Sequence, residues 1–162
     1  MKKLFTLVVA AFAALSVSAK EDIDISSIAT DNVVTFTSQW QWKGINYGST
    51  DETTGESTYA DKSAFEYIVF EYTTGTCADV NLTAQYEKDG TTGQYGANYY
   101  TSTETCTVFP AGGILAVKLD AAHSKTVNAV ALQNRNTAGA ITIKAAYFAS
   151  EAEYAEAKAA AD

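Results

Sequence analysis

The chain has 162 residues, of which 47% are hydrophobic and 19% are charged, and acidic residues outnumber basic ones by 19 to 11. The length fits a single domain with its own hydrophobic core. The formal net charge of −8 repels phosphate backbones and anionic lipid headgroups, so we expect neither a nucleic-acid nor a membrane partner.

Residues 1–19 have the pattern of a secretory signal peptide. Lys2 and Lys3 precede an apolar run over residues 4–15, and the small residues Ser18 and Ala19 precede the expected cleavage site. The apolar run is shorter than a membrane span. We therefore expect a secreted or periplasmic protein, whose net charge becomes −10 once the two leader lysines are removed.

Strands dominate the elements predicted after this leader. Runs rich in Val, Ile, Thr, Tyr and Phe are separated by Gly, Asn, Asp and Ser, as in chains built of short strands. The expected strands are residues 23–27, 33–42, 65–72, 80–87, 99–109, 114–119, 127–134 and 141–148, with a long polar loop at 43–61 and a turn at 88–98. Seven or eight strands at these intervals indicate an all-β, antiparallel, two-sheet β-sandwich.

The segment at residues 150–162 differs from the strands in composition. Ser150 and Glu153 form a capping-box pattern, and the alanines that follow favour a helix. We expect a short C-terminal helix, or the start of a linker, after a sandwich domain over residues 20–149.

Trp40 and Trp42 are the only tryptophans in the chain. In a regular strand over residues 33–42 both indoles lie on one face, because side chains two residues apart point the same way. Adjacent aromatic faces can stack on sugar rings. The two indoles also share parity with Val34 and Phe36, which favours a position in the core instead. A bulge in the strand before Trp40 would turn both indoles to the opposite face. Both interpretations stay open.

Cys77 and Cys106 are the only cysteines, and export would permit a disulfide between them. If they oppose each other in a hairpin, the turn falls between Thr91 and Thr92, in a segment that contains Asp and Gly. Such a bridge would stabilise the fold by roughly 3–4 kcal/mol in the chain-entropy model. Two free buried thiols are the alternative.

The residues needed for catalysis are scarce. His123 is the only histidine, so any triad would have to use it, and a zinc site has too few ligands. Glu66 and Glu71 lie on opposite faces of one expected strand and cannot flank a glycosidic bond. We therefore expect no enzymatic activity.

Four acidic residues lie in the long polar loop: Asp51, Glu52, Glu56 and Asp61. Carboxylates are suitable ligands for Ca²⁺, but the spacing is not that of an EF-hand. A solvated acidic loop is the simpler interpretation. Calcium, in a structural role, is the one cofactor that the sequence leaves as an alternative.

Amide and small side chains share the non-core faces of two expected strands. Asn81, Thr83 and Gln85 alternate with apolar residues in one strand, and Gln133 follows two alanines in the other. Lined up in a sheet, they would form a shallow surface whose amides both donate and accept hydrogen bonds, as sugar hydroxyls require. An ordinary solvated sheet face is equally consistent with the pattern.

Four segments carry a resemblance to a known family: WKGINYG, DKSAFEYIVFEY, VNAVALQN and ITIKAAYFASEAEY. Together they resemble the β-sandwich carbohydrate-binding modules attached to polysaccharide hydrolases of gut and rumen bacteria. The resemblance implies a jelly-roll sandwich that binds xylan, mannan or β-glucan without cleaving it. One departure is that the family's second tryptophan is replaced around residues 45–47.

The resemblance also implies site residues and partners. It makes Trp40, Trp42 and Tyr47 stacking residues and Gln133 a polar contact, and the face pattern described above adds Gln85. Besides the polysaccharide, the implied partner is a hydrolase domain or enzyme outside this chain. The alternative function is a secreted structural or protein-interaction sandwich that uses an edge strand or the helical tail.

Overall fold

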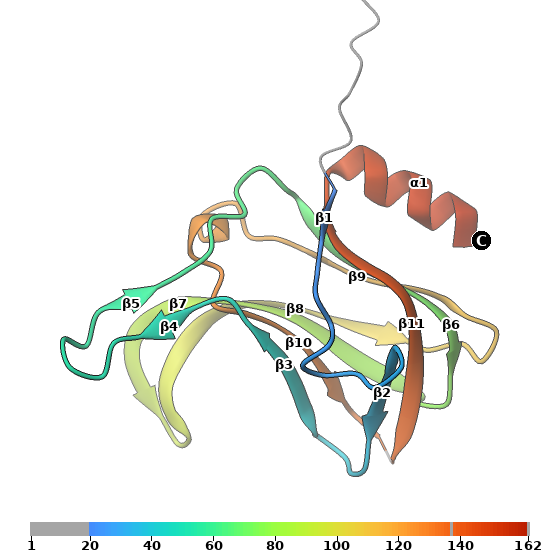
Figure 1. The fold of residues 1–162 in the computed structure, drawn as a ribbon, viewed down its shortest axis with the longest axis horizontal. Coiled ribbons are helices and arrows are strands. Elements are labelled where there is room, and N and C mark those ends of the chain that lie inside the picture. Colours follow the sequence, from blue (N-terminus) through green and yellow to red (C-terminus); the bar gives the residue numbers. More distant parts are fainter. Residues whose placement is uncertain (1–19, 137, 162) are drawn as a thin grey trace, which may run out of the picture.

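The computed structural model describes residues 20–136 and 138–161, so the predicted signal peptide lies outside the described residues. Figure 1 shows two antiparallel sheets that face each other, with a helix at the C-terminal end. The predicted all-β antiparallel sandwich with a short C-terminal helix is therefore confirmed. The jelly-roll connectivity stays a prediction.

The first sheet, called sheet A here, has the strand order β1-β11-β6-β9, and β2 also pairs with β11. Its strands are β1 (Glu21–Asp22), β2 (Val33–Phe36), β6 (Tyr67–Gly75), β9 (Gly113–Lys118) and β11 (Gly139–Ala149). The predicted strand at 23–27 is wrong, because the chain bonds β11 at β1 and through the Ile23 amide and then turns away.

The second sheet, called sheet B, has the strand order β3-β10-β7-β8. Its strands are β3 (Trp42–Asn46), β7 (Asp79–Gly93), β8 (Gly96–Thr107) and β10 (Ala129–Asn134). The predicted polar loop at 43–61 thus begins too early, and it contains a small ribbon of β4 (Ser49–Thr50) and β5 (Ser57–Thr58). A 3₁₀ turn, η1 (Ser124–Thr126), precedes β10.

The core lies between the two sheets. Sheet A contributes Phe70 and Phe148, and sheet B contributes Leu82 and Leu132, all of them fully buried. The buried Tyr86 satisfies its hydroxyl by donating to Ser102 Oγ at 3.0 Å and accepting from the Asp120 amide at 2.7 Å. Because Leu82 of β7 and Leu132 of β10 point into the core, the residues next to them in each strand point away from it.

The chain does not run straight from residue 33 to residue 42, as the alternation predicts. It leaves sheet A after Phe36, turns through residues 37–41 and enters sheet B at Trp42. Within the turn, the Gln41 side chain accepts the Thr37 amide at 2.7 Å. Trp40 therefore lies in the turn and Trp42 in β3. The shared parity with Val34 and Phe36, which favoured the core for both tryptophans, does not apply because residues 33–42 are not one strand.

The β7–β8 hairpin is longer than predicted: its turn, at Gly93–Gly96, lies inside the predicted turn segment of residues 88–98 but beyond the expected midpoint between Thr91 and Thr92. This register pairs Cys106 with Val80, three residues beyond Cys77. Both cysteines are free thiols, so the expected direct opposition of Cys77 and Cys106 is wrong and no disulfide joins them. The sequence places the turn too early because Asp89 and Gly90 resemble a turn, yet they lie within the strand at a register shift.

Helix α1 (Glu151–Ala161) covers the outer side of sheet A. The predicted capping box is confirmed: Ser150 Oγ accepts the Glu153 amide at 3.3 Å, and the Glu153 carboxylate accepts the Ser150 amide at 2.9 Å. Tyr154 stacks on Tyr67 with 4.1 Å between ring centroids, which docks the helix. No helix in the described ranges is long and apolar enough to cross a membrane.

Candidate binding face on sheet B

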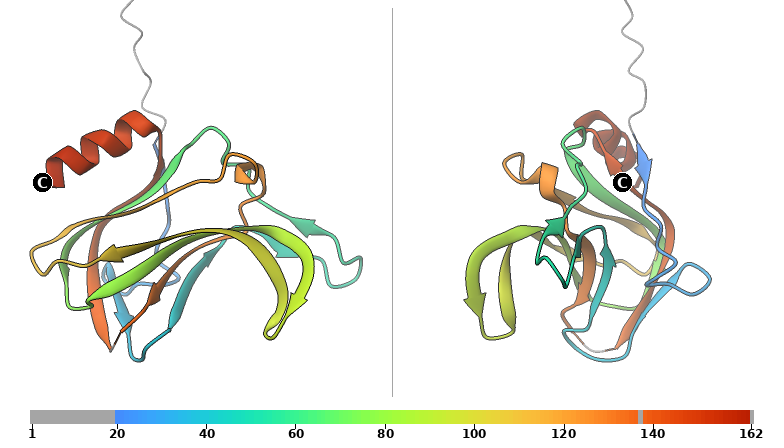
Figure 2. Two further views of the ribbon diagram at one scale, coloured as in Figure 1. Left: turned by 180° about the vertical axis from the view of Figure 1, so that it is seen from behind. Right: turned by 60° about the vertical axis from the view of Figure 1, so that its left-hand side comes forward.

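The side of sheet B that points away from the core, called the outer face here, is where most of the predicted site residues gather. The strand register arranges it in three rows, each written from β3 to β8: Trp42-Gln133-Asn81-Thr105, Gly44-Ala131-Thr83-Thr103 and Asn46-Ala129-Gln85-Thr101. Figures 1 and 2 show the β7–β8 hairpin curling away from the side that carries α1, which makes this face concave.

Small residues form the floor of the outer face. Ala129, Ala131 and Thr83 are buried although the register places them on the outer face. Thr83 bonds Thr103 across the strands with 2.9 Å between the hydroxyl oxygens. The middle of the outer face is therefore lined by small side chains that are shielded from solvent.

Trp42 stands at one end of this floor, and 43% of its surface is exposed. Its indole leans across Gly44, the next residue on the same face, so that a Cβ atom at position 44 would lie 2.5 Å from the indole Nε1. Glycine at this position thus allows the ring to lie low along the sheet.

Trp40 forms the rim beside Trp42, and 51% of its surface is exposed. Its φ of 60° lies in the left-handed region, which is strained for a bulky side chain. The end of β10 holds it there: the Trp40 amide donates to the Asn134 carbonyl at 2.7 Å, and the Trp40 carbonyl accepts from Gln133 Nε2 at 3.2 Å. Strained backbone is often found at functional sites.

A chain of hydrogen bonds crosses the face beside the two tryptophans. Thr105 Oγ1 donates to Asn81 Oδ1 at 2.9 Å and accepts from Arg135 Nη1 at 3.2 Å. The Arg135 guanidinium also lies over the Trp40 ring, 5.6 Å from its centroid. These contacts fix the orientation of the polar groups before any ligand arrives.

Gln85 lies at the opposite end of the outer face from Trp42. It is four residues along β7 from Asn81, a separation of about 13 Å at the usual rise of a strand. Its Oε1 accepts from Asn128 Nδ2 at 2.7 Å. The register also places Tyr99 on this face, beyond Thr101 towards the hairpin tip.

Tyr47 is the one predicted stacking residue that lies apart from the others. It has the opposite parity to Trp42 in the chain and packs against the core, edge-on to Phe148 at 5.7 Å. Burial, followed by the negative charges of Glu21 and Asp24, raises the pKa of Tyr47 to about 12. The structure thus brings together Trp40, Trp42, Gln133 and Gln85, but not Tyr47.

The prediction from sequence missed Arg135 and the β8 threonines. Thr101, Thr103 and Thr105 alternate along β8, and this period-2 pattern was the available signal for them. Arg135 is the only arginine in the chain, but no local pattern indicates where its side chain lies.

His123, the residue that any catalytic triad would need, does not belong to the three rows of the outer face. His123 Nδ1 is 2.8 Å from Asp120 Oδ2, and its ring stacks on Tyr100 at 4.1 Å. The His123 contact, followed by the Ala122 amide, lowers the pKa of the Asp120 carboxyl. In the described part of the chain, the imidazole of His123 contacts the Asp120 carboxylate and the rings of Tyr86 and Tyr100, and no nucleophilic side chain bonds to it.

The acidic loop has no metal geometry. Asp51 Oδ1 instead accepts the amides of Thr53 and Thr54, at 2.7 and 3.1 Å, and closes a turn. Within residues 20–136 and 138–161, no three His, Cys, Asp or Glu side chains are grouped so that they could hold a metal ion. The structure therefore offers no support for the calcium site.

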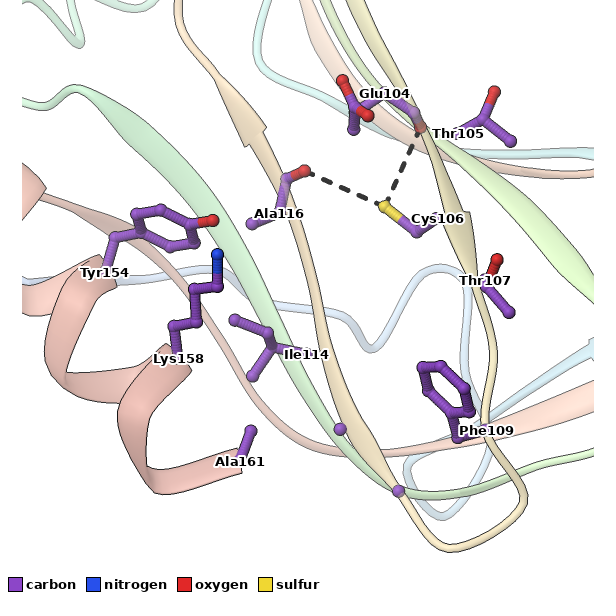
Figure 3. A pocket seen from close by; sticks show the side chains of 12 residues that line it. Glu104, Thr105, Cys106, Thr107, Phe109, Ile114, Ala116, Tyr154, Lys158 and Ala161 are labelled. Carbon is purple, nitrogen blue, oxygen red and sulfur yellow. Dashed lines mark hydrogen bonds between the residues drawn. The ribbon is translucent and has the colours of Figure 1, made fainter.

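A separate hollow of about 320 Å³ lies between β8, β9 and α1 (Figure 3). The thiol of Cys106 at its wall donates to the Ala116 carbonyl at 3.8 Å. Burial raises the pKa of the Cys106 thiol, which disfavours the reactive thiolate form. None of the predicted ligand-binding residues lines this hollow.

Comparison with known proteins gives no relative: no family model, no curated protein and no solved structure matches the chain.

Proposed function

We propose that the outer face of sheet B binds polysaccharide without cleaving it. The observation that carries the proposal is the pair of exposed tryptophans, Trp40 and Trp42, beside a concave floor of small residues, amides and hydroxyls. Both tryptophans of the chain are on this one face, and one of them is held there at the cost of backbone strain.

The physical basis is stacking combined with hydrogen bonding. An indole face covers the C–H groups of a sugar ring, while neighbouring amides donate to and accept from its hydroxyls. The side chains of Gln133, Asn81 and Thr105 are already held by hydrogen bonds, so little ordering is needed on binding. Such a shallow, polar surface supports modest affinity.

The ligand class that fits is a soluble plant cell-wall polysaccharide: xylan, mannan or β-glucan. A long chain can lie along the face, which extends about 13 Å from the Trp42 row to the Gln85 row. A predominantly uncharged ligand also avoids repulsion by an acidic protein. We propose an exported binder that serves a polysaccharide hydrolase, either as an attached domain or as a partner.

The test is native affinity electrophoresis in gels containing each polysaccharide in turn. Trp42→Ala should weaken the retardation about tenfold in apparent affinity, since about 1.4 kcal/mol of stacking is removed. Phe109→Ala is the matched control, because Phe109 is an exposed aromatic residue on the loop after β8. Equal retardation of the Trp42→Ala variant, with circular dichroism unchanged, would remove this face from any role in glycan binding.

A further inference from the structure

Arg135 has an unusual position for the only arginine of an acidic protein. It follows the last residue of β10, and its guanidinium lies between the Trp40 ring and β8. One of its five N–H donors bonds Thr105 Oγ1 at 3.2 Å. The single guanidinium of the chain is therefore located on the face that carries both tryptophans.

In the described part of the chain, the ion pairs are those of Lys62, Lys118, Lys144 and His123, and none involves Arg135. Asp79 is the acid beside it in the sheet register, because the Arg135 amide donates to the Asp79 carbonyl at 3.2 Å. The Asp79 carboxylate instead accepts from Thr107 and Asn136, each at 3.3 Å. Within the described residues, the guanidinium therefore lies beside Thr105 and Trp40 of the outer face and forms no ion pair with a carboxylate.

We propose that Arg135 binds a carboxylate carried by the polysaccharide, such as a uronic acid substituent. This inference rests on the proposed glycan-binding function of the outer face. A guanidinium presents a planar fork of donors that matches a carboxylate in a bidentate pair. Stacking on Trp40 and the bond to Thr105 hold this fork in place.

The charge of the whole protein restricts the ligand further. With a net charge of −8, the protein repels a polymer that carries a carboxylate on every sugar. The one guanidinium beside the tryptophans can pair with one carboxylate at a time. The expected ligand is therefore a polysaccharide with a largely neutral backbone and widely spaced acidic substituents, and not a polyuronate.

The experiment compares two forms of one polysaccharide: xylan that bears glucuronic acid side groups, and the same preparation after its carboxylates are reduced to alcohols. Wild-type protein should bind the acidic form about fivefold more tightly than the reduced form, and added salt should narrow the difference. Arg135→Gln should bind both forms equally, with the affinity of wild type for the reduced form. Arg135→Lys should keep part of the preference, because it keeps the charge but loses the fork.

The outcomes separate this inference from the proposed function. Equal binding of both forms by wild-type protein overturns the role of Arg135 and leaves glycan binding intact. An equal loss of affinity for both forms in Arg135→Gln would make Arg135 a support for Trp40 only, which also overturns it. Binding of neither form, with no binding of mannan or β-glucan, rejects the proposed function itself.

Discussion

At the scale of single residues, Trp40 combines strain with exposure. Its left-handed backbone is maintained by two hydrogen bonds to the end of β10, and its ring faces solvent and Arg135. Because the left-handed backbone gives a bulky residue no stability, this conformation supports the proposed role of Trp40 in ligand binding.

This leads to a matched pair of variants at position 40. Trp40→Gly should be about 1 kcal/mol more stable to urea than Trp40→Ala, because glycine relieves the left-handed strain and alanine does not. Both should lose affinity for the polysaccharide. Equal stability of the two variants would show that the backbone at this position is not strained.

At the scale of elements, helix α1 depends on its cap and on one stacked pair. It has only 11 residues, so it would be marginal alone, and Tyr154 on Tyr67 docks it to sheet A. The cap residue Ser150 makes two of the bonds that close its first turn.

Ser150→Ala should therefore destabilise helix α1 by about 1 kcal/mol. Hydrogen exchange of the helix amides should become about fivefold faster, while exchange in β7 and β10 stays the same. Glu156→Ala, an exposed change on the same helix outside the cap, is the control. Unchanged protection in Ser150→Ala would mean that docking alone holds the helix.

The elements also show what a sequence can predict. The alternation in AVALQN correctly separates the buried Val130 and Leu132 from the outer-face Ala131 and Gln133 of β10, because a strand's period is local information. The turn at residues 37–41 could not be predicted in this way, since Gln133 and Asn134, over 90 residues away, hold it. For the candidate site, strand alternation predicted that the amide side chains point away from the core. The exposure of the tryptophans and the position of Arg135 depend on the distant contacts and could not be predicted from alternation.

At the scale of the whole molecule, the partly buried Tyr47 links stability to alkaline pH. Burial, with the charges of Glu21 and Asp24, raises the pKa of Tyr47 from 10.0 to about 12. An acid whose folded pKa is raised stabilises the fold fully below its unfolded pKa, and this contribution is lost as the pH rises through the folded value. The affected window is therefore from pH 10.0 to about 12.

Tyr47→Phe should consequently lose less stability than wild type across that window, when urea unfolding is followed at several alkaline pH values. Tyr95→Phe is the control, because Tyr95 is 94% exposed at the hairpin tip. Parallel pH profiles for Tyr47→Phe and wild type would contradict the partly buried position of Tyr47 against Phe148.

The central claim is that polysaccharide binds on the outer face of sheet B, where both tryptophans of the chain lie. Their intrinsic fluorescence therefore reports on this face alone, and titration with soluble xylan, mannan or β-glucan tests the claim most directly. The account predicts a saturable shift of the tryptophan emission with at least one of the three, which is reduced in Trp40→Phe and in Trp42→Phe. Saturable binding that leaves the emission unchanged, or no binding of any of the three, would contradict it.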